Sequence, residues 1–316
     1  MYFTLKQLRY YDAALRSGSI VKASIEMNIS QSSITAALDA IEQSVGQELF
    51  RRVPAKGLQP TDAGRRVGLR IAEFLEQARV FESDLMSISG DLTGTLHVGC
   101  YAPSAPYVLP RLMKELAQTY PSVRVDLVET DLAAMVELLQ NGRIDLALTY
   151  RRTMPDSLPF MPMFEARPYA LLPENSPFAQ VPEVTLAELA TKPLIMLDLP
   201  TTVEYFAAVF KEYGLEFQIA HTTKSSSVLR GLVAAGFGHS VLNICSPSDR
   251  QGTNGYVCRP IAGTLHTPEF GVAFTNASRR SSIVQAVLDI CQKMAKTQAF
   301  DDLVMRPSGE SKTIKW

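Results

Sequence analysis

The chain has 316 residues, of which 46% are hydrophobic and 20% charged, and its formal net charge is −1. This composition is ordinary for a globular protein with room for two or three domains, and it excludes a chain that is basic throughout. No apolar run reaches the roughly 18 to 20 residues of a membrane span, and the N-terminus lacks an apolar stretch followed by a cleavage site. We therefore expect a cytoplasmic protein with no membrane contact.

Four cysteines are spread along the chain without a C-x-x-C pair: Cys100, Cys245, Cys258 and Cys291. This spacing is typical of reduced thiols and predicts neither a disulfide framework nor a metal site. A redox-sensing thiol stays an open alternative, although an inert buried cysteine is the commoner case.

The first 50 residues have the spacing of three short helices. Apolar residues recur every three or four positions in the first of them: Leu5, Leu8, Tyr11 and Leu15. Gly18 ends this helix and Ser19 caps the next, which ends at Asn28, a residue that readily adopts a left-handed conformation. Ser30 then supplies the N-cap of a third helix.

The third helix carries one apolar face and is followed by a basic loop. Its apolar residues fall at i, i+4, i+7 and i+11: Ile34, Leu38, Ile41 and Val45. Gly46 ends the helix, and the stretch LFRRVPAKGLQPT supplies two short extended pieces around a turn. This order predicts a winged helix-turn-helix DNA-binding domain over residues 1–60.

Residues 61–90 contain the most regular apolar spacing in the chain. Residues spaced 4-3-4-3-4-3 form one heptad stripe: Val67, Ile71, Phe74, Ala78, Phe81, Leu85 and Ile88. The stripe lies between Pro60-Thr61 and Ser89-Gly90, and it predicts a coiled-coil linker helix through which the chain dimerises. The alternative is a helix that packs on its own domain.

Strands and helices alternate after Gly94. Residues 95–150 read as strand, helix, strand, helix and strand, which predicts a parallel sheet. A second α/β set follows a proline-rich passage, and two α/β lobes with a ligand cleft between them are the natural arrangement. Residues 301–316 have no periodicity, so we expect a flexible tail there.

The order of these segments resembles that of LysR-type transcriptional regulators, over essentially the whole chain to about residue 300. The resemblance is carried, in order, by LRYYDAALRSGSIVKASIEMNISQSSITAALDAIEQSVGQELFRR, LQPTDAGRRV, LHVG, LPRLM, YPSVRVDLVE, NGRIDLALTY and LVAAGFGHSVL. It implies an α plus α/β multidomain protein, with a winged helix-turn-helix, a linker helix and a two-lobed effector-binding domain of the periplasmic-binding-protein type over 91–300. Lobe I would comprise about 95–163 and 267–300, and lobe II about 164–266.

The resemblance also implies partners. A LysR-type regulator binds double-stranded operator DNA as a homodimer or homotetramer, responds to a small-molecule inducer, and has RNA polymerase as a further partner. It is not an enzyme and needs no metal or cofactor besides this effector. The chain departs from the family in its third helix, where Ser32 replaces the usual proline and Ala36, Ala37 and Asp39 replace basic or amide residues.

The apolar face of the third helix turns an uncharged polar face outward. Amide, hydroxyl and methyl groups on this face, together with one carboxylate, suit base edges: Gln31, Ser32, Ser33, Thr35, Ala36 and Asp39. Phosphate contacts are expected from cations of the second helix and of the wing: Lys22, Arg51, Arg52 and Lys56. The alternative is that the outward residues form only a solvated helix face.

In the family the inducer lies between the lobes, against loops that follow the first strands and against helix starts of the second lobe. The corresponding residues here are Tyr101, Ala102, Pro103, Ser104, Thr130, Thr201, Thr202, Ser225 and Ser226. Their hydroxyls and helix N-termini suit an anion such as a carboxylate, to which Arg151 would add a charged partner. For Ser104, Thr202 and Ser226, helix capping is an equally good alternative role.

Two other classes of function compete with a regulator. The four histidines are scattered, and neither a G-x-S-x-G elbow nor a phosphate-binding loop occurs, which argues against an enzyme on an α/β scaffold. A two-lobed solute-binding protein would need an export signal and would have no use for a helix-turn-helix.

Overall fold

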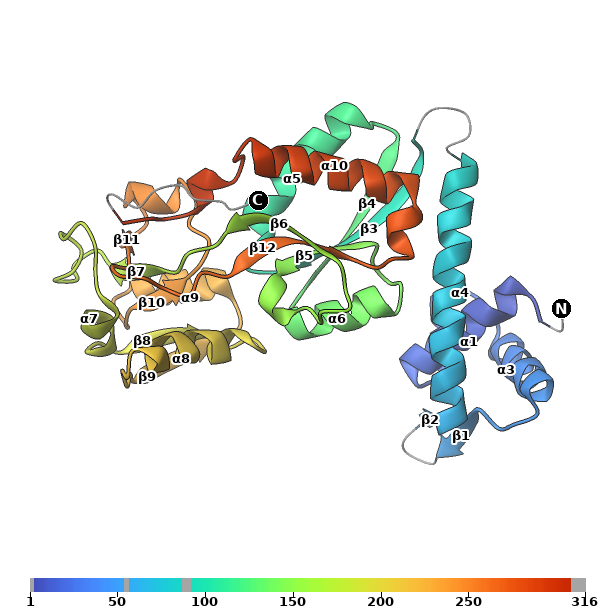
Figure 1. The fold of residues 1–316 in the computed structure, drawn as a ribbon. Coiled ribbons are helices and arrows are strands. Elements are labelled where there is room, and N and C mark those ends of the chain that lie inside the picture. The colour runs from blue at the N-terminus through green and yellow to red at the C-terminus, as the bar shows by residue number, and fades with distance from the viewer. Residues whose placement is uncertain (1–2, 54–56, 87–91, 308–316) are drawn as a thin grey trace. The chain divides into compact units, whose positions relative to one another are not determined.

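The computed structural model describes residues 3–53, 57–86 and 92–307, without the side chains of Arg52, Ser83, Asp84 and Met86. The chain divides into two compact units, Met1–Met86 and Ser87–Trp316 (Figure 1). The first unit contains the helix-turn-helix and the linker helix, and the second contains the two α/β lobes.

The first unit is built from helices and one small hairpin. Its elements in order are α1 (Leu5–Ser17), α2 (Ile20–Glu26), α3 (Gln31–Val45), β1 (Phe50–Val53), β2 (Gly57–Pro60) and α4 (Asp62–Met86). Strands β1 and β2 pair antiparallel, with Phe50 opposite Pro60. This is a winged helix-turn-helix, as the sequence predicts.

Local signals in the sequence fix the ends of these helices. Gly18 (φ 59°) and Gly46 (φ 73°) end α1 and α3 in the left-handed conformation, and Asn28 (φ 52°) adopts it in the turn before α3. The hydroxyls of Ser19 and Ser30 cap α2 and α3 by accepting from the backbone N–H three residues ahead. These local predictions are confirmed.

The helices of the first unit enclose a small core. The buried face of α3 carries Ile34, Leu38 and Ile41, which share this core with Tyr11 of α1. Tyr11 is fully buried, and its hydroxyl donates to the backbone carbonyl of Gly64 in α4 at 3.0 Å. Helices α1, α3 and the start of α4 therefore form one packed body.

The wing is attached to the turn between α1 and α2. The backbone N–H of Leu58 donates to the carbonyl of Gly18 at 2.8 Å. Gly57 has φ +73°, and a Cβ there would lie 2.6 Å from the same carbonyl oxygen, so glycine is required for this approach. Lys56 and the side chain of Arg52, both predicted phosphate contacts, lie outside the described residues.

An acidic side chain of α3 holds the start of the wing. Oε1 of Glu42 accepts hydrogen bonds from the backbone N–H groups of Leu49 at 2.6 Å and Phe50 at 2.9 Å. Leu49 and Phe50 are buried, so their N–H groups need an acceptor inside the protein. Glu42 therefore connects the third helix to the wing.

The start of the heptad stripe belongs to the core of the first unit. Ile71 is buried there and Val67 packs against the same cluster, because the first turns of α4 cover α1. Ile71 is therefore a core residue of the first unit, and its part in a dimer surface stays a prediction.

The later part of the stripe stays exposed. The side chains of Phe74, Phe81 and Leu85 are 45%, 62% and 49% exposed, far more than large apolar groups in a closed core. Ala78 lies between them and is half-buried, and Ile88 is outside the described residues. The surface available to a partner is thus shorter than the stripe read from the sequence.

Lobe I is a mixed sheet with helices on both faces. Its strands are β3 (Gly94–Tyr101), β4 (Val123–Thr130), β5 (Leu146–Tyr150), β6 (Phe160–Glu165) and β12 (Glu269–Phe274), in the order β4-β3-β5-β12-β6. The parallel pairing predicted for the first three strands is confirmed, whereas β12 runs antiparallel to both of its neighbours. One face is covered by α5 (Ala105–Thr119) and α10 (Ser282–Lys296), and the other by α6 (Leu132–Gln140) (Figure 1).

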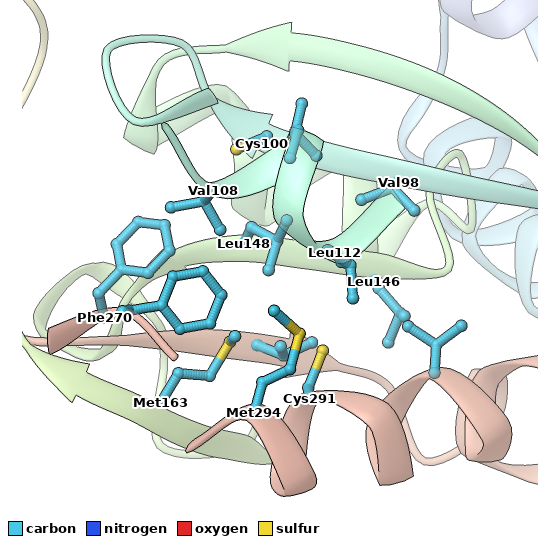
Figure 2. Packing of buried hydrophobic residues seen from close by; sticks show 14 of the residues in the cluster. Val98, Cys100, Val108, Leu112, Leu146, Leu148, Met163, Phe270, Cys291 and Met294 are labelled. Atoms are coloured by element: carbon cyan, nitrogen blue, oxygen red, sulfur yellow. The ribbon is translucent and has the colours of Figure 1, made fainter. Parts of the chain in front are cut away.

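The main core of lobe I lies between its sheet and the helices α5 and α10. Figure 2 shows side chains of β5, α5 and α10 converging there, among them Leu146, Leu148, Leu112 and Cys291. Alternate residues of a strand point to opposite faces, so Ala147 packs on the α6 side instead.

Lobe II is a second sheet between helices. Its strands are β7 (Tyr169–Pro173), β8 (Leu194–Leu197), β9 (Ile219–Thr223), β10 (Ser240–Leu242) and β11 (Tyr256–Pro260). The order is β10-β7-β11 in one part and β8-β9 in the other, and backbone hydrogen bonds of His239 with Pro193 and Ile195 join the two. The helices are α7 (Leu186–Ala190), α8 (Thr202–Glu212) and α9 (Ser226–Ala234); α8 and α9 pack in two separate clusters.

Two chain segments, 166–168 and 261–268, connect the lobes, and they are bonded to each other. The backbone N–H of Ala166 donates to the carbonyl of Pro268 at 2.9 Å. The buried guanidinium of Arg167 donates to the carbonyls of Ile261 and Gly263. The two segments therefore form one paired hinge.

The residues after α10 are packed, which corrects the predicted flexible tail as far as residue 306. Asp301–Leu303 form a single 3-10 turn, and Phe300, Leu303 and Val304 are buried with the core of lobe I. One turn is too short to show a hydrophobic period, so the sequence pattern could not indicate it. Residues 308–316 lie outside the description.

In the described part of the chain, no helix combines the length and the apolar character needed to cross a membrane. Among the same residues, no three His, Cys, Asp or Glu side chains come together as metal ligands would. All four cysteines are buried free thiols.

Glu42→Ala is expected to destabilise the first unit by about 1 to 3 kcal/mol, because two buried N–H groups lose their acceptor. Denaturant unfolding of the full chain, followed by a fluorophore attached to the wing, measures this change. Asp39→Ala, on the exposed side of the same helix, is the control and should stay within about 0.5 kcal/mol of the wild type. Equal stability of both variants would contradict the connecting role of Glu42.

Candidate DNA-binding surface and effector cleft

The first turns of α3 carry the polar groups predicted to read bases. Gln31, Ser32, Ser33 and Ala36 are exposed, and Thr35 is half-buried. They follow the N-terminus of the helix, where backbone N–H groups and the helix dipole favour a phosphate. The structure therefore confirms that these polar side chains face outward from α3, as the apolar stripe predicts.

Short hydrogen bonds order the hydroxyls of this surface. The Ser30 hydroxyl shares 2.8 Å hydrogen bonds with the hydroxyls of both Ser32 and Ser33. The hydroxyl of Thr35 donates to the carbonyl of Gln31 at 3.1 Å, which leaves its oxygen free to accept from a base. A proline at position 32 would remove one member of this serine cluster.

The two acidic residues of α3 have different environments. Glu42 is used by the wing, as described above. Asp39 is exposed, and it has neither a hydrogen bond nor an ion pair with any residue in the described part of the chain. Asp39 is therefore an acidic side chain that the exposed face of α3 leaves open to solvent.

Cations flank this surface on α2, the wing and the start of α4. Lys22 is exposed, and the side chain of Arg51 is 70% exposed beside Glu48 at 3.3 Å. An exposed pair of this kind is weak, so a phosphate can replace the carboxylate. Arg65, in the first turn of α4, forms an ion pair with Asp62 of the same turn.

An apolar groove crosses the first unit between α1, α3 and α4. It is lined by Phe3, Leu8, Ile41, Val45, Arg66, Val67, Arg70, Ile71 and Phe74. Val45, predicted to be buried, is 41% exposed here. A continuous exposed apolar surface is typical of a protein contact site.

The second unit has a cleft between its lobes. The cleft is lined by Tyr101, Pro103, Ser104, Tyr150, Arg152, Leu197, Thr202, Phe206, Ser226, Arg230, Leu242, Asn243 and Ile244. It is narrow, since about 30 Å³ is open to the centre of a water molecule. Separation of the lobes would enlarge this space for a ligand.

Side chains of lobe I reach lobe II across the cleft. The hydroxyls of Tyr101 in lobe I and Thr202 in lobe II share a buried hydrogen bond of 2.9 Å. Arg152 of lobe I donates to the carbonyl of Thr201 at 3.1 Å and lies over the ring of Tyr205, 4.3 Å from its centroid. Burial raises the pKa of Tyr101 to about 12, so its phenol stays protonated at neutral pH.

Arg152 is a half-buried cation that forms no ion pair with a described carboxylate. Its Nε–H group is buried and has no acceptor among the described residues. Burial lowers the pKa of this guanidinium, because the charged form loses hydration, yet arginine keeps its charge at neutral pH. An anion in the cleft would satisfy both the charge and the free donor.

Arg230 is the second cation of the cleft, but it is paired. Its side chain is 11% exposed and lies 3.3 Å from Asp249, whose other oxygen accepts from the Tyr256 hydroxyl at 2.7 Å. The guanidinium also lies over the ring of Tyr107. No Asp or Glu is among the lining residues, and Glu204 acts on Arg152 only electrostatically, without an ion pair.

The structure brings together half of the residues predicted for the effector. The lining includes Tyr101, Pro103, Ser104, Thr202 and Ser226. It does not include Ala102, Thr130, Arg151, Thr201 and Ser225. Arg151 pairs with Asp156 at 2.9 Å instead, and the Ser225 hydroxyl caps α9 by accepting from the backbone N–H of Val228.

The sequence prediction misses the cationic residues of the cleft. Arg152 is the neighbour of the predicted Arg151, and choosing between them requires the path of the 3-10 turn Arg151–Thr153 after β5. Arg230 stands four residues after Ser226 on α9, so helical spacing from a predicted residue would have found it. For Tyr150 and Asn243 no signal in the sequence points to the cleft.

The backbone is strained beside Arg152. Thr201 has φ 65° and ψ −12°, a left-handed conformation that is rare for a β-branched residue and costs about 1 to 3 kcal/mol. Its hydroxyl is buried without a partner in the described part of the chain, and its carbonyl accepts from Arg152. The start of α8 is thus held in a conformation that other contacts must maintain.

The two units match two domains of known proteins. Residues 5–65 match the bacterial regulatory helix-turn-helix protein domain of the lysR family, and residues 89–296 match the LysR substrate binding domain. The chain belongs to the LysR family. It is a LysR-family transcriptional regulator with a DNA-binding helix-turn-helix domain and an effector-binding domain.

Individual relatives agree with this assignment. The LysR-family chain is 25% identical over 245 residues to the uncharacterized HTH-type transcriptional regulator YvbU of Bacillus subtilis, over 78% of this chain and 83% of that one. It is 30% identical to HinK, a LysR family transcriptional regulator from Pseudomonas aeruginosa, with a TM-score of 0.60 over 93% of this chain and 99% of that one. Full-length CbnR complexed with its target DNA has the same fold, at 20% identity and a TM-score of 0.55 over 93% of this chain and 100% of that one.

Proposed function

We propose that this LysR-family regulator responds to a small anion that binds Arg152 in the cleft between its lobes. The observation that carries the proposal is the buried Nε–H of a cation that has no carboxylate partner among the described residues. A buried charge is costly unless it is compensated, and a carboxylate accepts from a guanidinium through two oxygens.

The remaining lining limits the kind of anion. Hydroxyl and amide groups of Ser104, Ser226 and Asn243 can bond polar substituents, while Phe206 and Leu197 offer an apolar wall. The charge of Arg152 would be balanced by a monoanion, whereas a dianion would bring an excess negative charge into a largely buried site. A compact monocarboxylate with an apolar body fits these conditions.

Arg152→Gln is expected to weaken binding of such effectors about tenfold to a hundredfold, since a hydrogen bond to a charged group contributes about 1.5 to 3 kcal/mol. A thermal-shift screen of small carboxylates against the full chain identifies ligands, and titration calorimetry then measures both proteins. Arg151→Gln is the matched control and should bind normally. If the uncharged carboxamides bind as tightly as the carboxylates, the anion proposal fails.

For DNA, we infer that α3 reads bases through its short polar side chains while the wing and α2 hold phosphates. The surface that supports this combines the exposed Gln31, Ser32, Ser33 and Ala36 with the cations Lys22 and Arg51. Amide and hydroxyl groups suit base edges, and phosphate contacts supply most of the affinity. This regulator works in the compartment that holds the DNA, the cytoplasm, where RNA polymerase is the further partner.

Gln31→Ala and Thr35→Ala should relax the base preference at a few operator positions, because each variant removes a group that bonds a base edge, at a cost of about 1 to 3 kcal/mol. Arg51→Ala should weaken binding to operator and to unrelated duplexes alike and should reduce the salt dependence by about one phosphate contact. Selection from a randomised duplex library, repeated at two salt concentrations, measures both effects. A changed sequence preference in Arg51→Ala would refute the division between α3 and the wing.

For assembly, we infer that two chains pair through α4. The exposed part of its stripe, Phe74, Phe81 and Leu85, lies beside the apolar groove that Phe74 also lines. Burial of one large apolar side chain contributes about 1.5 to 3 kcal/mol, so three on each chain can support a dimer. Two such dimers would form the tetramer expected from the sequence.

Phe81→Asp is expected to produce monomers, because the dimer would bury a charge in an apolar interface. Operator binding should fall at least a hundredfold, because the two DNA-binding domains are then no longer linked. Sedimentation velocity and gel-shift titration measure the two effects together. Leu69→Asp is the control, since Leu69 is also exposed on α4 but lies off the stripe. A monomeric Phe81→Asp protein with full operator affinity would contradict this assembly.

A further inference from the structure

Residues 299–306, here called the C-terminal strap, are bound tightly to lobe I. Arg111 of α5 donates to both carboxylate oxygens of Asp302, at 2.5 and 2.8 Å, and to the carbonyl of Ala299 at 2.7 Å. These hydrogen bonds from Arg111 lower the pKa of the Asp302 carboxyl, so the pair persists at neutral pH. The ring of Phe300 stacks on Phe164 of the lobe I core.

The same strap is bonded to lobe II. Arg250, in the loop between β10 and β11, donates to the carbonyls of Asp302 at 2.6 Å and Val304 at 2.9 Å. The backbone N–H of Cys245 donates to the carbonyl of Leu303 at 2.9 Å. Backbone groups of the strap therefore meet lobe II, while the carboxylate of Asp302 meets lobe I.

The apolar side chains of the strap are divided between the two cores in the same way. Leu303 and Val304 are buried in the cluster of lobe I, and Met305 is buried in the cluster of lobe II that contains Cys245. An ion pair between Asp301 and Arg306, at 2.7 Å, keeps the turn compact.

The strap reaches the effector cleft through one loop. Asn243 and Ile244 line the cleft, and Cys245, the next residue, donates to the strap. The lobes are also joined by the paired hinge segments 166–168 and 261–268 and by the side-chain contacts across the cleft. A third attachment away from these segments restricts rotation of the lobes about the hinge.

We propose that the C-terminal strap holds the lobes of the effector-binding domain in their closed arrangement and so sets how readily the cleft opens. The inference rests on the cleft as the effector site of the proposed function, but not on the charge of the effector. Effector binding would then have to overcome the Arg111, Arg250 and Met305 contacts, and the regulator would respond only to ligands that bind strongly enough to do so.

Hydrogen exchange of the full chain, without ligand, tests the strap. Arg111→Gln removes its charged hydrogen bonds to lobe I, and Arg250→Gln removes its charged hydrogen bonds to lobe II. Arg259→Gln is the matched control, because Arg259 also donates to backbone carbonyls, those of Val181, Ala179 and Cys258, but all of them are in lobe II. Exchange is followed in the first turn of α8, residues 202–205. This turn belongs to lobe II, and its Thr202 lines the cleft.

Both strap variants are expected to speed exchange in this turn about tenfold, since each removes hydrogen bonds to a charged group, whereas the control should match the wild type there. Exchange that rises only in residues 299–306 would overturn the proposal, because the segment would then be a packed tail without influence on the lobes. An equal rise in Arg259→Gln would overturn it as well. Because no ligand is added, failure of the anion proposal leaves this test valid.

Discussion

The half-buried guanidinium of Arg152 links the proposed recognition of an effector to the contact between the lobes. It projects from the end of β5 in lobe I, donates to the backbone of lobe II and covers the ring of Tyr205, so one side chain connects both lobes. Carbonyl and ring dipoles replace only part of the water that this charge has given up. The same contact ends on Thr201, whose backbone is strained. An anion that binds the Arg152 guanidinium would therefore compete with its contacts to lobe II. Binding of the anion and separation of the lobes would then be coupled.

The absence of positive charge on α3 has a structural explanation in part. Glu42 is needed at its position because the entry to the wing contains two buried N–H groups. The serine cluster at the start of the helix occupies the place of the usual proline, and it presents hydroxyls instead of a rigid turn. Asp39 has no such internal use, and so its carboxylate faces the DNA-binding surface without compensation. In the proposed arrangement, affinity would come from Lys22, Arg51 and the doubling of all contacts in a dimer.

Features set by neighbouring residues could be predicted from the sequence, and features set by the packing of distant segments could not. The caps at Ser19 and Ser30 and the order of helices and strands follow from local chemistry and spacing. The choice of Arg152 over Arg151 depends on one turn of backbone after β5, and the role of Ile71 depends on how closely α4 covers α1. The fixed position of residues 299–306 depends on Arg111 and Arg250, which lie 191 and 52 residues from Asp302 in the chain. No window along the sequence contains such pairs.

The double hydrogen bond of Glu42 has a consequence for how DNA shape is sensed. Because the third helix and the wing are bonded to each other, and the wing is bonded in turn to the α1–α2 turn at Gly18, the base-reading surface and the phosphate-holding strands cannot adjust separately. In such a domain the distance between α3 and the wing is fixed, and so is the distance it can span between the major groove and the neighbouring DNA backbone. If the proposed division between α3 and the wing holds, this domain would favour operators whose groove width already matches that span, and a sequence that widens or narrows the groove would bind more weakly even where every contacted base is kept.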